Sequence, residues 1–254
     1  AWLNIYEDEA LAAAKKLDEH IASGQPLLPL HGVIVGLKDV IAYKHHLLSG
    51  ASKILENFQS IYHATVVEKL LQEEAIIIGR QNCDEFAMGS SNENSAYGAV
   101  KNAIDNSRVP GGSSGGSAVS VQAGLSMISL GSDTGGSVRQ PADFCGVVGL
   151  KPSYGRISRY GLIAYASSFD QIGVFALTVE DAALVLEVIA GADDFDSTVS
   201  TKPVPAYVQA IKQKQGTKKI AYFKETLTHP GLDAEIKSQI ENQIEQVRGA
   251  GHVV

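Results

Sequence analysis

Two segments rich in glycine and serine hold the residues best suited to chemistry in this sequence. Residues 111–117 read Gly-Gly-Ser-Ser-Gly-Gly-Ser, and residues 131–137 read Gly-Ser-Asp-Thr-Gly-Gly-Ser. Glycines let the backbone adopt positive φ angles and approach a ligand closely, and neighbouring serines offer hydroxyl groups to a reaction or to the start of a helix. Both segments are therefore candidates for part of an active site.

Three other interpretations of residues 111–117 are weak. A flexible linker is disfavoured because structured segments flank it, and a phosphate-binding loop would end in Gly-Lys-Ser or Gly-Lys-Thr. The G-x-S-x-G pattern of a nucleophile elbow is present, but an elbow follows a strand. Residues 105–110 read Asp-Asn-Ser-Arg-Val-Pro and do not predict one.

The second segment offers what acyl transfer requires. Ser137 comes just before a predicted short helix, so successive backbone N–H groups there could point at one oxyanion, helped by the helix dipole. The residues that would supply these groups are Thr134, Gly135, Gly136 and Ser137 itself. A lone serine in this position is more commonly a helix N-cap, so a chemical role for Ser137 depends on a base that can activate it.

Lys38 is the best-placed candidate for that base. The seven histidines lie outside both segments and are interpreted as surface or loop residues: His20, His31, His45, His46, His63, His229 and His252. A lysine can accept a proton if burial keeps it neutral, and Lys38 ends the apolar run at 33–37. A lysine at the end of a strand is more often simply solvated, so the residues alone leave both roles open.

Residues near the second segment predict supporting roles. Asp133 and Arg139 flank Ser137, and they either form an ion pair that braces the loop or leave Arg139 on a helix surface. Asp170 is expected to be structural. Cys145 lies in an apolar turn and is interpreted as a core thiol rather than a nucleophile. No residue is predicted to bind a metal ion.

Composition excludes several classes of protein. The chain has 254 residues, of which 44% are hydrophobic and 19% charged, which is typical of a folded globular protein. The formal net charge of −7 and the absence of a Lys/Arg cluster disfavour direct binding to nucleic acid. Two cysteines predict reduced thiols, and no signal-peptide core or membrane-length apolar run is present. The sequence predicts a soluble, cytoplasmic protein.

The predicted elements alternate between helices and apolar strands, which favours an α/β fold with a mixed central sheet covered by helices. Helices are expected at 7–23, 66–74, 117–123, 138–144, 179–190 and 236–247. Strands or strand-like segments are expected at 33–37, 76–79, 127–130, 147–150 and 220–223. Two capping pairs, Thr65 with Glu68 and Thr178 with Asp181, predict helix starts. The strand-like end at 251–254 predicts that the sheet is incomplete at the C-terminus.

With Lys38, Ser113 and Ser137 in this order, the sequence resembles the amidase signature family. The matching stretches cover most of residues 26–200, and they lie at 35–39, 111–117, 131–152 and 167–173. Several multi-residue matches in a fixed order are far more specific than a single glycine motif. The resemblance implies the amidase signature fold in a single domain over 1–254, with an N-terminal helical segment at 1–25 and the signature core at 26–200.

The resemblance also implies a role for each site residue. Ser137 would be the nucleophile, and Lys38 the ultimate base. Ser113 would bridge them through a cis peptide bond after Gly112. Backbone N–H groups of residues 134–137 would form the oxyanion hole, and a loop containing Met88, Gly89 and Ser90 would line the substrate pocket.

Within the family, residues 84–98 and 154–173 resemble the members that belong to tRNA-dependent amidotransferases. That similarity implies hydrolysis of glutamine and delivery of ammonia to partner subunits B and C in a heterotrimer. The partner would hold the mischarged tRNA, Glu-tRNA(Gln) or Asp-tRNA(Asn), and would use ATP and Mg²⁺. No cofactor is implied for this chain.

Two positions depart from the family pattern, because Val40 replaces a more usual asparagine and Asp143 stands where a small residue is common. Neither belongs to the Ser-Ser-Lys set. Members of this kind also carry a C-terminal half that holds the amino and carboxylate groups of glutamine. Three alternatives therefore stay open: a stand-alone amidase acting on other acyl amides, a non-catalytic scaffold, and an inert fragment.

Overall fold

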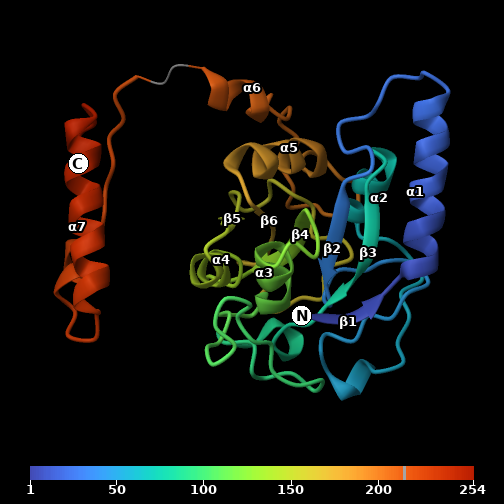
Figure 1. Cartoon of the computed structure of the whole chain (residues 1–254), viewed down its shortest axis with the longest axis horizontal. Helices are drawn as coiled ribbons and strands as arrows, with labels where there is room; N and C mark the ends of the chain where they lie inside the picture. Colours follow the sequence, from blue (N-terminus) through green and yellow to red (C-terminus); the bar gives the residue numbers. More distant parts are fainter. Residues whose placement is uncertain (214–215) are drawn as a thin grey trace. The chain divides into compact units, whose positions relative to one another are not determined.

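The computed structural model describes residues 1–213 and 216–254 (Figure 1). These residues form two compact units, 1–210 and 211–254, and the helix α6 (Tyr207–Lys212) contains the boundary. The larger unit carries all the strands named below and every residue of the predicted site. The smaller unit contains the 3₁₀ helix η3 (Lys224–Thr228) and the helix α7 (Ala234–Gly249). The single domain expected over 1–254 stays a prediction.

A six-stranded mixed sheet forms the centre of the larger unit, in the order β1-β3-β2-β4-β6-β5. Strands β3, β2 and β4 run parallel, whereas β1, β6 and β5 pair antiparallel with their neighbours. The strands are β1 (Trp2–Ile5), β2 (Ile34–Lys38), β3 (Ile76–Gln81), β4 (Ile128–Asp133), β5 (Val148–Leu150) and β6 (Gln171–Ala176). The predicted α/β fold with a mixed sheet is thus confirmed.

Helices cover both faces of this sheet. Val174 in β6 belongs to a core cluster that includes apolar residues of α2 (Thr65–Gln72) and α5 (Val179–Ile189). Phe175, the next residue, belongs to a second cluster with residues of α3 (Gly115–Gln122) and α4 (Arg139–Cys145). Successive side chains of a strand point to opposite faces, so the two helix pairs form two separate layers.

The sheet topology assembles the predicted site. Parallel strands end at the same edge of a sheet, and β2 and β4 are direct neighbours. Lys38 is the last residue of β2, and Ser132 and Asp133 are the last two of β4. The first glycine-serine segment leads into α3, which packs against β4. The two segments and the lysine therefore meet although they are far apart in sequence.

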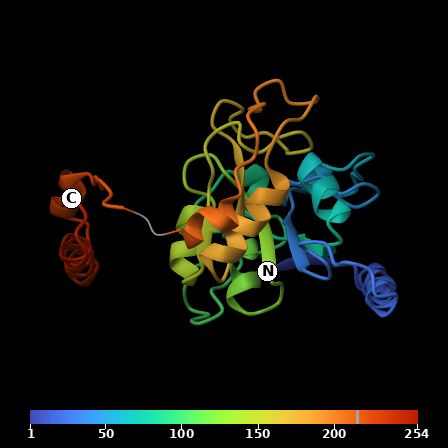
Figure 2. The same ribbon diagram turned by 90° about the horizontal axis from the view of Figure 1, so that it is seen from above.

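The helix α1 (Glu7–Ala22) lies at the margin of the larger unit, and Figure 2 looks along its axis. All of α1 is described, and none of its residues is buried. It packs against β3. Among the described residues, no helix combines the length and the apolar character that crossing a membrane requires.

Several predicted elements need correction. Thr65 does not cap α2: the N-cap is Ala64, no side chain caps the helix, and the Thr65 hydroxyl instead donates to Asp193. Residues 220–223 form no strand. The nearest β pairing is an isolated bridge between Lys219 and Val253. The predicted cap of α5 is confirmed, since the Thr178 hydroxyl accepts a hydrogen bond from the Asp181 N–H at 3.1 Å.

We expect Thr178→Ala to lower the free energy of unfolding by about 1 kcal/mol, because it leaves an N–H group of the first turn of α5 without its cap. Urea unfolding followed by the fluorescence of Trp2, the only tryptophan, measures this change. Thr178→Ser keeps the capping hydroxyl and should stay close to the wild type. An equal loss in both variants would show that the methyl group, not the cap, is responsible.

Candidate active site

Lys38 is completely buried at the end of β2. Its Nζ donates hydrogen bonds to the Ser113 hydroxyl at 2.7 Å and to the Ser132 hydroxyl at 2.9 Å. Burial lowers the pKa of Lys38 from 10.5 to about 8, and negative charge at Asp84 and Asp133 opposes part of that shift. Near neutral pH, a useful fraction of Lys38 is therefore an uncharged amine that can accept a proton.

Ser113 follows a cis peptide bond between Gly112 and Ser113. Its side chain has no exposed surface. The Gly112 N–H donates to the Gln140 side chain at 3.0 Å, which links the first segment to α4. A Cβ atom at Gly112 would lie 2.1 Å from a carboxylate oxygen of Asp84, so only glycine fits here. The local packing thus fixes the position from which Ser113 reaches Lys38.

The second segment wraps around the Asp133 carboxylate. That carboxylate accepts hydrogen bonds from the N–H groups of Gly136 at 2.8 Å and Val138 at 3.1 Å. It also pairs with the Arg139 guanidinium at 3.0 Å. Burial opposes ionisation, but the hydrogen bonds from Arg139 and the backbone keep the pKa of Asp133 below its ordinary value. Of the two predicted roles, the structure shows the bracing ion pair.

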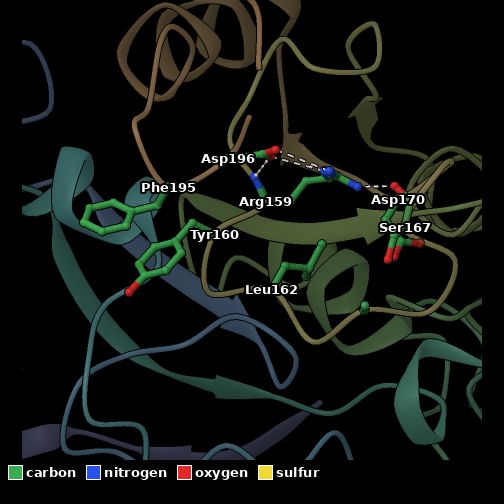
Figure 3. Close-up of a pocket in the computed structure, with 8 residues that line it drawn as sticks. Arg159, Tyr160, Leu162, Ser167, Asp170, Phe195 and Asp196 are labelled. Carbon is green, nitrogen blue, oxygen red and sulfur yellow. Dashed lines mark hydrogen bonds and ion pairs between the residues drawn. The ribbon is translucent and has the colours of Figure 1, made fainter. Parts of the chain in front are cut away.

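Asp170 ties the second segment to a neighbouring loop. Its carboxylate accepts hydrogen bonds from the Thr134 hydroxyl at 2.6 Å and from the N–H groups of Tyr165 and Ala166 at 2.9 and 3.0 Å. Asp170 also lines a cavity apart from the two segments, formed with Arg159 and Asp196, which Figure 3 shows. There the Arg159 guanidinium pairs with the Asp196 carboxylate at 3.2 Å. These contacts agree with the structural role predicted for Asp170.

A cavity of about 290 Å³ opens beside the two segments. It is large enough for a small substrate and lies just below the usual range of drug-sized ligand pockets. Residues of both segments, of the helix α4 and of two further stretches of chain line it: Ala87, Gly89, Ser90, Gly112, Gly135, Gly136, Ser137, Gln140 and Tyr165. The structure thus brings the predicted nucleophile, oxyanion loop and substrate loop to one place.

The predicted residues do not all reach that cavity. Ser137 lies on its wall, and its carbonyl accepts a hydrogen bond from the Ser114 N–H at 3.2 Å. Among the described residues, the Ser137 hydroxyl forms no hydrogen bond with Ser113. Thr134 and Met88 do not line the cavity, and the Met88 side chain is half exposed. The contact between Lys38 and Ser113 is therefore the best-formed part of the predicted site.

Sequence reasoning missed three residues of this region. Ser132, the second partner of Lys38, lies inside the segment 131–137, so its position beside Asp133 was a usable signal. Gln140 lies inside the family stretch 131–152 and holds Gly112. Tyr165 lies inside the family-like stretch 154–173, which was a usable signal, but its residue type alone did not suggest a place at the cavity.

Both cysteines are buried and free. Burial raises the pKa of Cys83 and that of Cys145 to about 12. The Cys145 thiol donates to the Pro110 carbonyl at 3.5 Å and packs in the core cluster with α3 and α4. A thiol of this kind is protonated at neutral pH, which agrees with its interpretation as a core residue.

Comparison with known proteins identifies the class. The family model for amidases matches residues 1–254. The chain therefore belongs to the amidase family, as its motifs predicted.

The similar proteins narrow this class. The chain is 55% identical over 251 residues to the glutamyl-tRNA(Gln) amidotransferase A subunit of Koribacter versatilis, covering 99% of this chain and 52% of the relative. It is 53% identical to that of Chlorobium luteolum, covering 98% of this chain and 52% of the relative. The chain thus spans about half the length of the curated relatives it matches.

Solved structures share the fold. The A subunit of the glutamyl-tRNA(Gln) amidotransferase from Thermotoga maritima superimposes with a TM-score of 0.84 at 40% identity, over 98% of this chain and 58% of that one. The peptide amidase from Stenotrophomonas maltophilia superimposes with a TM-score of 0.90 at 35% identity, over 100% of this chain and 53% of that one.

We expect Asp133→Asn to loosen the second segment, because the neutral amide loses the ion pair with Arg139 and keeps only one acceptor oxygen. Stability should fall by about 1–3 kcal/mol, and amide hydrogen exchange at Gly136 and Val138 should accelerate. Asp143→Asn is the matched control, since Asp143 is exposed on α4. Equal exchange rates in both variants would contradict the bracing role.

Proposed function

We propose that this chain is the amidase part of a glutamyl-tRNA(Gln) amidotransferase A subunit, and that it releases ammonia from the side-chain amide of glutamine. The observation that carries the proposal is the buried 2.7 Å hydrogen bond between Lys38 and Ser113 beside the cavity that Ser137 lines. The 55% identity to the A subunit of Koribacter versatilis supports the choice of substrate.

The proposed reaction begins with neutral Lys38. It accepts the proton of Ser113 as Ser113 takes the proton of Ser137, and the Ser137 oxygen attacks the amide carbon. For this step Ser137 moves toward Ser113 to form the hydrogen bond that the relay needs. Apo active sites often tighten in this way when substrate binds.

Backbone N–H groups of Thr134, Gly135 and Ser137 then stabilise the tetrahedral oxyanion, whereas the predicted donor Gly136 gives its N–H to the Asp133 carboxylate and holds the loop in shape. Such donors are each worth about 3–4 kcal/mol of transition-state stabilisation. The carbon–nitrogen bond breaks, and the proton held by Lys38 returns through Ser113 to the leaving nitrogen. Water next hydrolyses the glutamyl ester of Ser137, which yields glutamate and restores the three residues. In this proposal, Gly89 and Ser90, which line the same cavity, contact the substrate, and Met88 helps to shape the loop that carries them.

The proposal gives the remaining steps to partner proteins. Ammonia passes to subunits B and C of a cytoplasmic heterotrimer. There ATP and Mg²⁺ serve the amidation of Glu-tRNA(Gln) or Asp-tRNA(Asn), while this chain binds no cofactor for its own step. The net charge of −7 supports tRNA binding elsewhere, because phosphate contacts require clustered basic residues.

A stand-alone amidase is the second candidate. The observation that favours it is the TM-score of 0.90 with a peptide amidase, which exceeds the 0.84 with the amidotransferase protein from Thermotoga maritima. The same Ser-Ser-Lys set would serve either substrate, so the choice rests on which amide the intact protein accepts.

We expect Ser137→Ala to reduce ammonia release by at least about 10³-fold, because the nucleophile is lost while the oxyanion hole remains. Ser113→Ala should act similarly, because it breaks the path to Lys38. The assay measures ammonia from glutamine in the intact protein that contains this chain, with and without partner proteins.

Ser117→Ala is the control, since the Ser117 hydroxyl donates to the Leu130 carbonyl and takes no part in the relay. It should retain activity. Turnover of simple acyl amides without turnover of glutamine would favour the stand-alone amidase. Full glutaminase activity in Ser137→Ala would refute both candidates.

We expect the rate to rise with pH, to reach half its maximum near pH 8 and to level off above it, because Lys38 must be neutral and its pKa is about 8. Well below that value, the slope should approach about tenfold per pH unit. The folded chain also releases this proton more readily than the unfolded chain, so the free energy of unfolding should rise between about pH 8 and 10.5. A pH–rate profile and pH-dependent urea unfolding measure both effects.

Lys38→Met keeps a chain of similar length without the titrating group. It should abolish the activity and remove the rise in stability between about pH 8 and 10.5. A rate that falls as pH increases toward 8 would be incompatible with Lys38 as the base.

A further inference from the structure

Two histidines and one glutamate form a cluster on the larger unit, away from the active site. His20 lies in the last turn of α1, His31 in the loop before β2, and Glu74 in the turn between α2 and β3. The Nδ1 atoms of His20 and His31 lie 2.8 and 2.5 Å from the two carboxylate oxygens of Glu74. The rings stand edge to face, with centroids 5.4 Å apart.

The partial burial of this cluster was not expected. The sequence interpretation placed every histidine on the surface or in a loop, yet the side chain of His31 is only 6% exposed, and those of His20 and Glu74 are 22% exposed. His31 does lie in a loop, as interpreted, but its side chain is largely buried, which the sequence did not indicate. The reason is that the chain folds α1 back over the turn at Glu74, which no local pattern indicates.

Both histidines keep one ring nitrogen without a partner. The Nε2 atoms of His20 and His31 are buried, and neither has a hydrogen-bond partner among the residues that the structure describes. A buried polar atom in this condition is destabilising. The Nδ1 atoms face the Glu74 carboxylate, so they are the ring nitrogens that can share one cation with it, and the ion would take the place of the protons that link each ring to the carboxylate.

We propose that His20, His31 and Glu74 bind one divalent cation of the zinc type, with water completing the coordination. One potential ligand atom from each residue lies within 4.8 Å of those of the other two. Two imidazoles with one carboxylate form a donor set that zinc uses in proteins, whereas magnesium and calcium prefer oxygen ligands alone.

The geometry needs only a small adjustment to hold such an ion. Zinc–ligand bonds of about 2.0–2.2 Å place neighbouring ligand atoms of a tetrahedron roughly 3.4 Å apart. The widest pair in the cluster therefore has to close by at most about 1.4 Å, while the two Nδ1–carboxylate pairs at 2.8 and 2.5 Å have to open by about 0.6 and 0.9 Å.

The bound cation would fasten α1 to the rest of the unit. None of the residues of α1, all of which are described, is buried, so apolar packing contributes little to its attachment. The three ligands come from three separate segments of chain. The Gly32 N–H already donates to the Glu74 carbonyl at 3.0 Å, which joins two of those segments. A metal ion would add the third.

Calorimetric titration of the metal-free chain with Zn²⁺ tests the proposal. We expect one saturable site, a melting temperature that rises with Zn²⁺ concentration, and slower amide hydrogen exchange in the last turn of α1. His20→Gln and Glu74→Gln should each weaken binding by about 10- to 100-fold or more. Mg²⁺ at the same concentration should have no effect.

His46→Gln is the matched control. His46 Nε2 also contacts a carboxylate, that of Glu9 on α1 at 3.1 Å, but this pair has no third ligand among the described residues. Its removal should leave Zn²⁺ affinity unchanged. Absence of saturable binding would overturn the proposal, as would equal affinity in the wild type and Glu74→Gln, or an equal loss in His46→Gln.

The visible spectrum of Co²⁺ bound to the wild-type chain gives a second test that does not depend on whether a variant folds. A four-coordinate site with imidazole and carboxylate ligands produces intense d–d bands, and Zn²⁺ should displace them. If the chain mixed with excess Co²⁺ shows only the weak bands of Co²⁺ in water, the site does not exist.

Discussion

A lysine amine without access to water lies at the point where two parallel strands end, and the surrounding structure follows from the need to accommodate it. The cost of burying a charge favours the neutral form of Lys38, and hydroxyl groups of Ser113 and Ser132 satisfy its hydrogen bonds. Both serines are delivered by glycine-rich segments that approach the strand ends closely. The parallel core of the sheet is what brings those segments to the lysine.

Buried carboxylates organise the loops around this point. Asp39 accepts N–H groups of Ser49 and Ala51 and pairs with Arg80 at 2.6 Å, and Asp84 accepts N–H groups of residues 92 and 94. Asp133 and Asp170 hold the oxyanion loop and its neighbour in the same way. Each loop therefore takes its shape from a charged group that satisfies several backbone donors at once, and not from apolar packing.

The sequence predicted the parts of this architecture that repeat a simple pattern. The all-apolar run Ile76–Ile78 predicted β3, and Thr178 with Asp181 predicted the start of α5. Thr65 with Glu68 has the same spacing but does not form a cap, because Asp193, a residue distant in sequence, takes the Thr65 hydroxyl. Strand β6 was missed because Gly173 and the buried polar Gln171 interrupt its apolar pattern, although antiparallel pairing with β4 makes it central to the sheet.

The same contrast holds at the site. The three predicted catalytic residues stand in conspicuous motifs, and the structure brings Lys38 and Ser113 into contact while Ser137 faces the cavity. Tyr165 lies in the family-like stretch 154–173 but carries no chemical pattern of its own, and the cluster around Glu74 lies in no motif. They arise from tertiary neighbours, which only a folded chain specifies.

The strand β1 has a consequence for the behaviour of the molecule in concentrated solution. It pairs antiparallel with β3, and a bulge between Trp2 and Asn4 breaks its register. Without this short strand, the apolar β3 would present a free row of backbone donors and acceptors, the template on which chains associate into aggregates. The short, bulged strand β1 covers the edge of β3 and is itself a poor partner for another strand, so it reduces edge-to-edge association of chains.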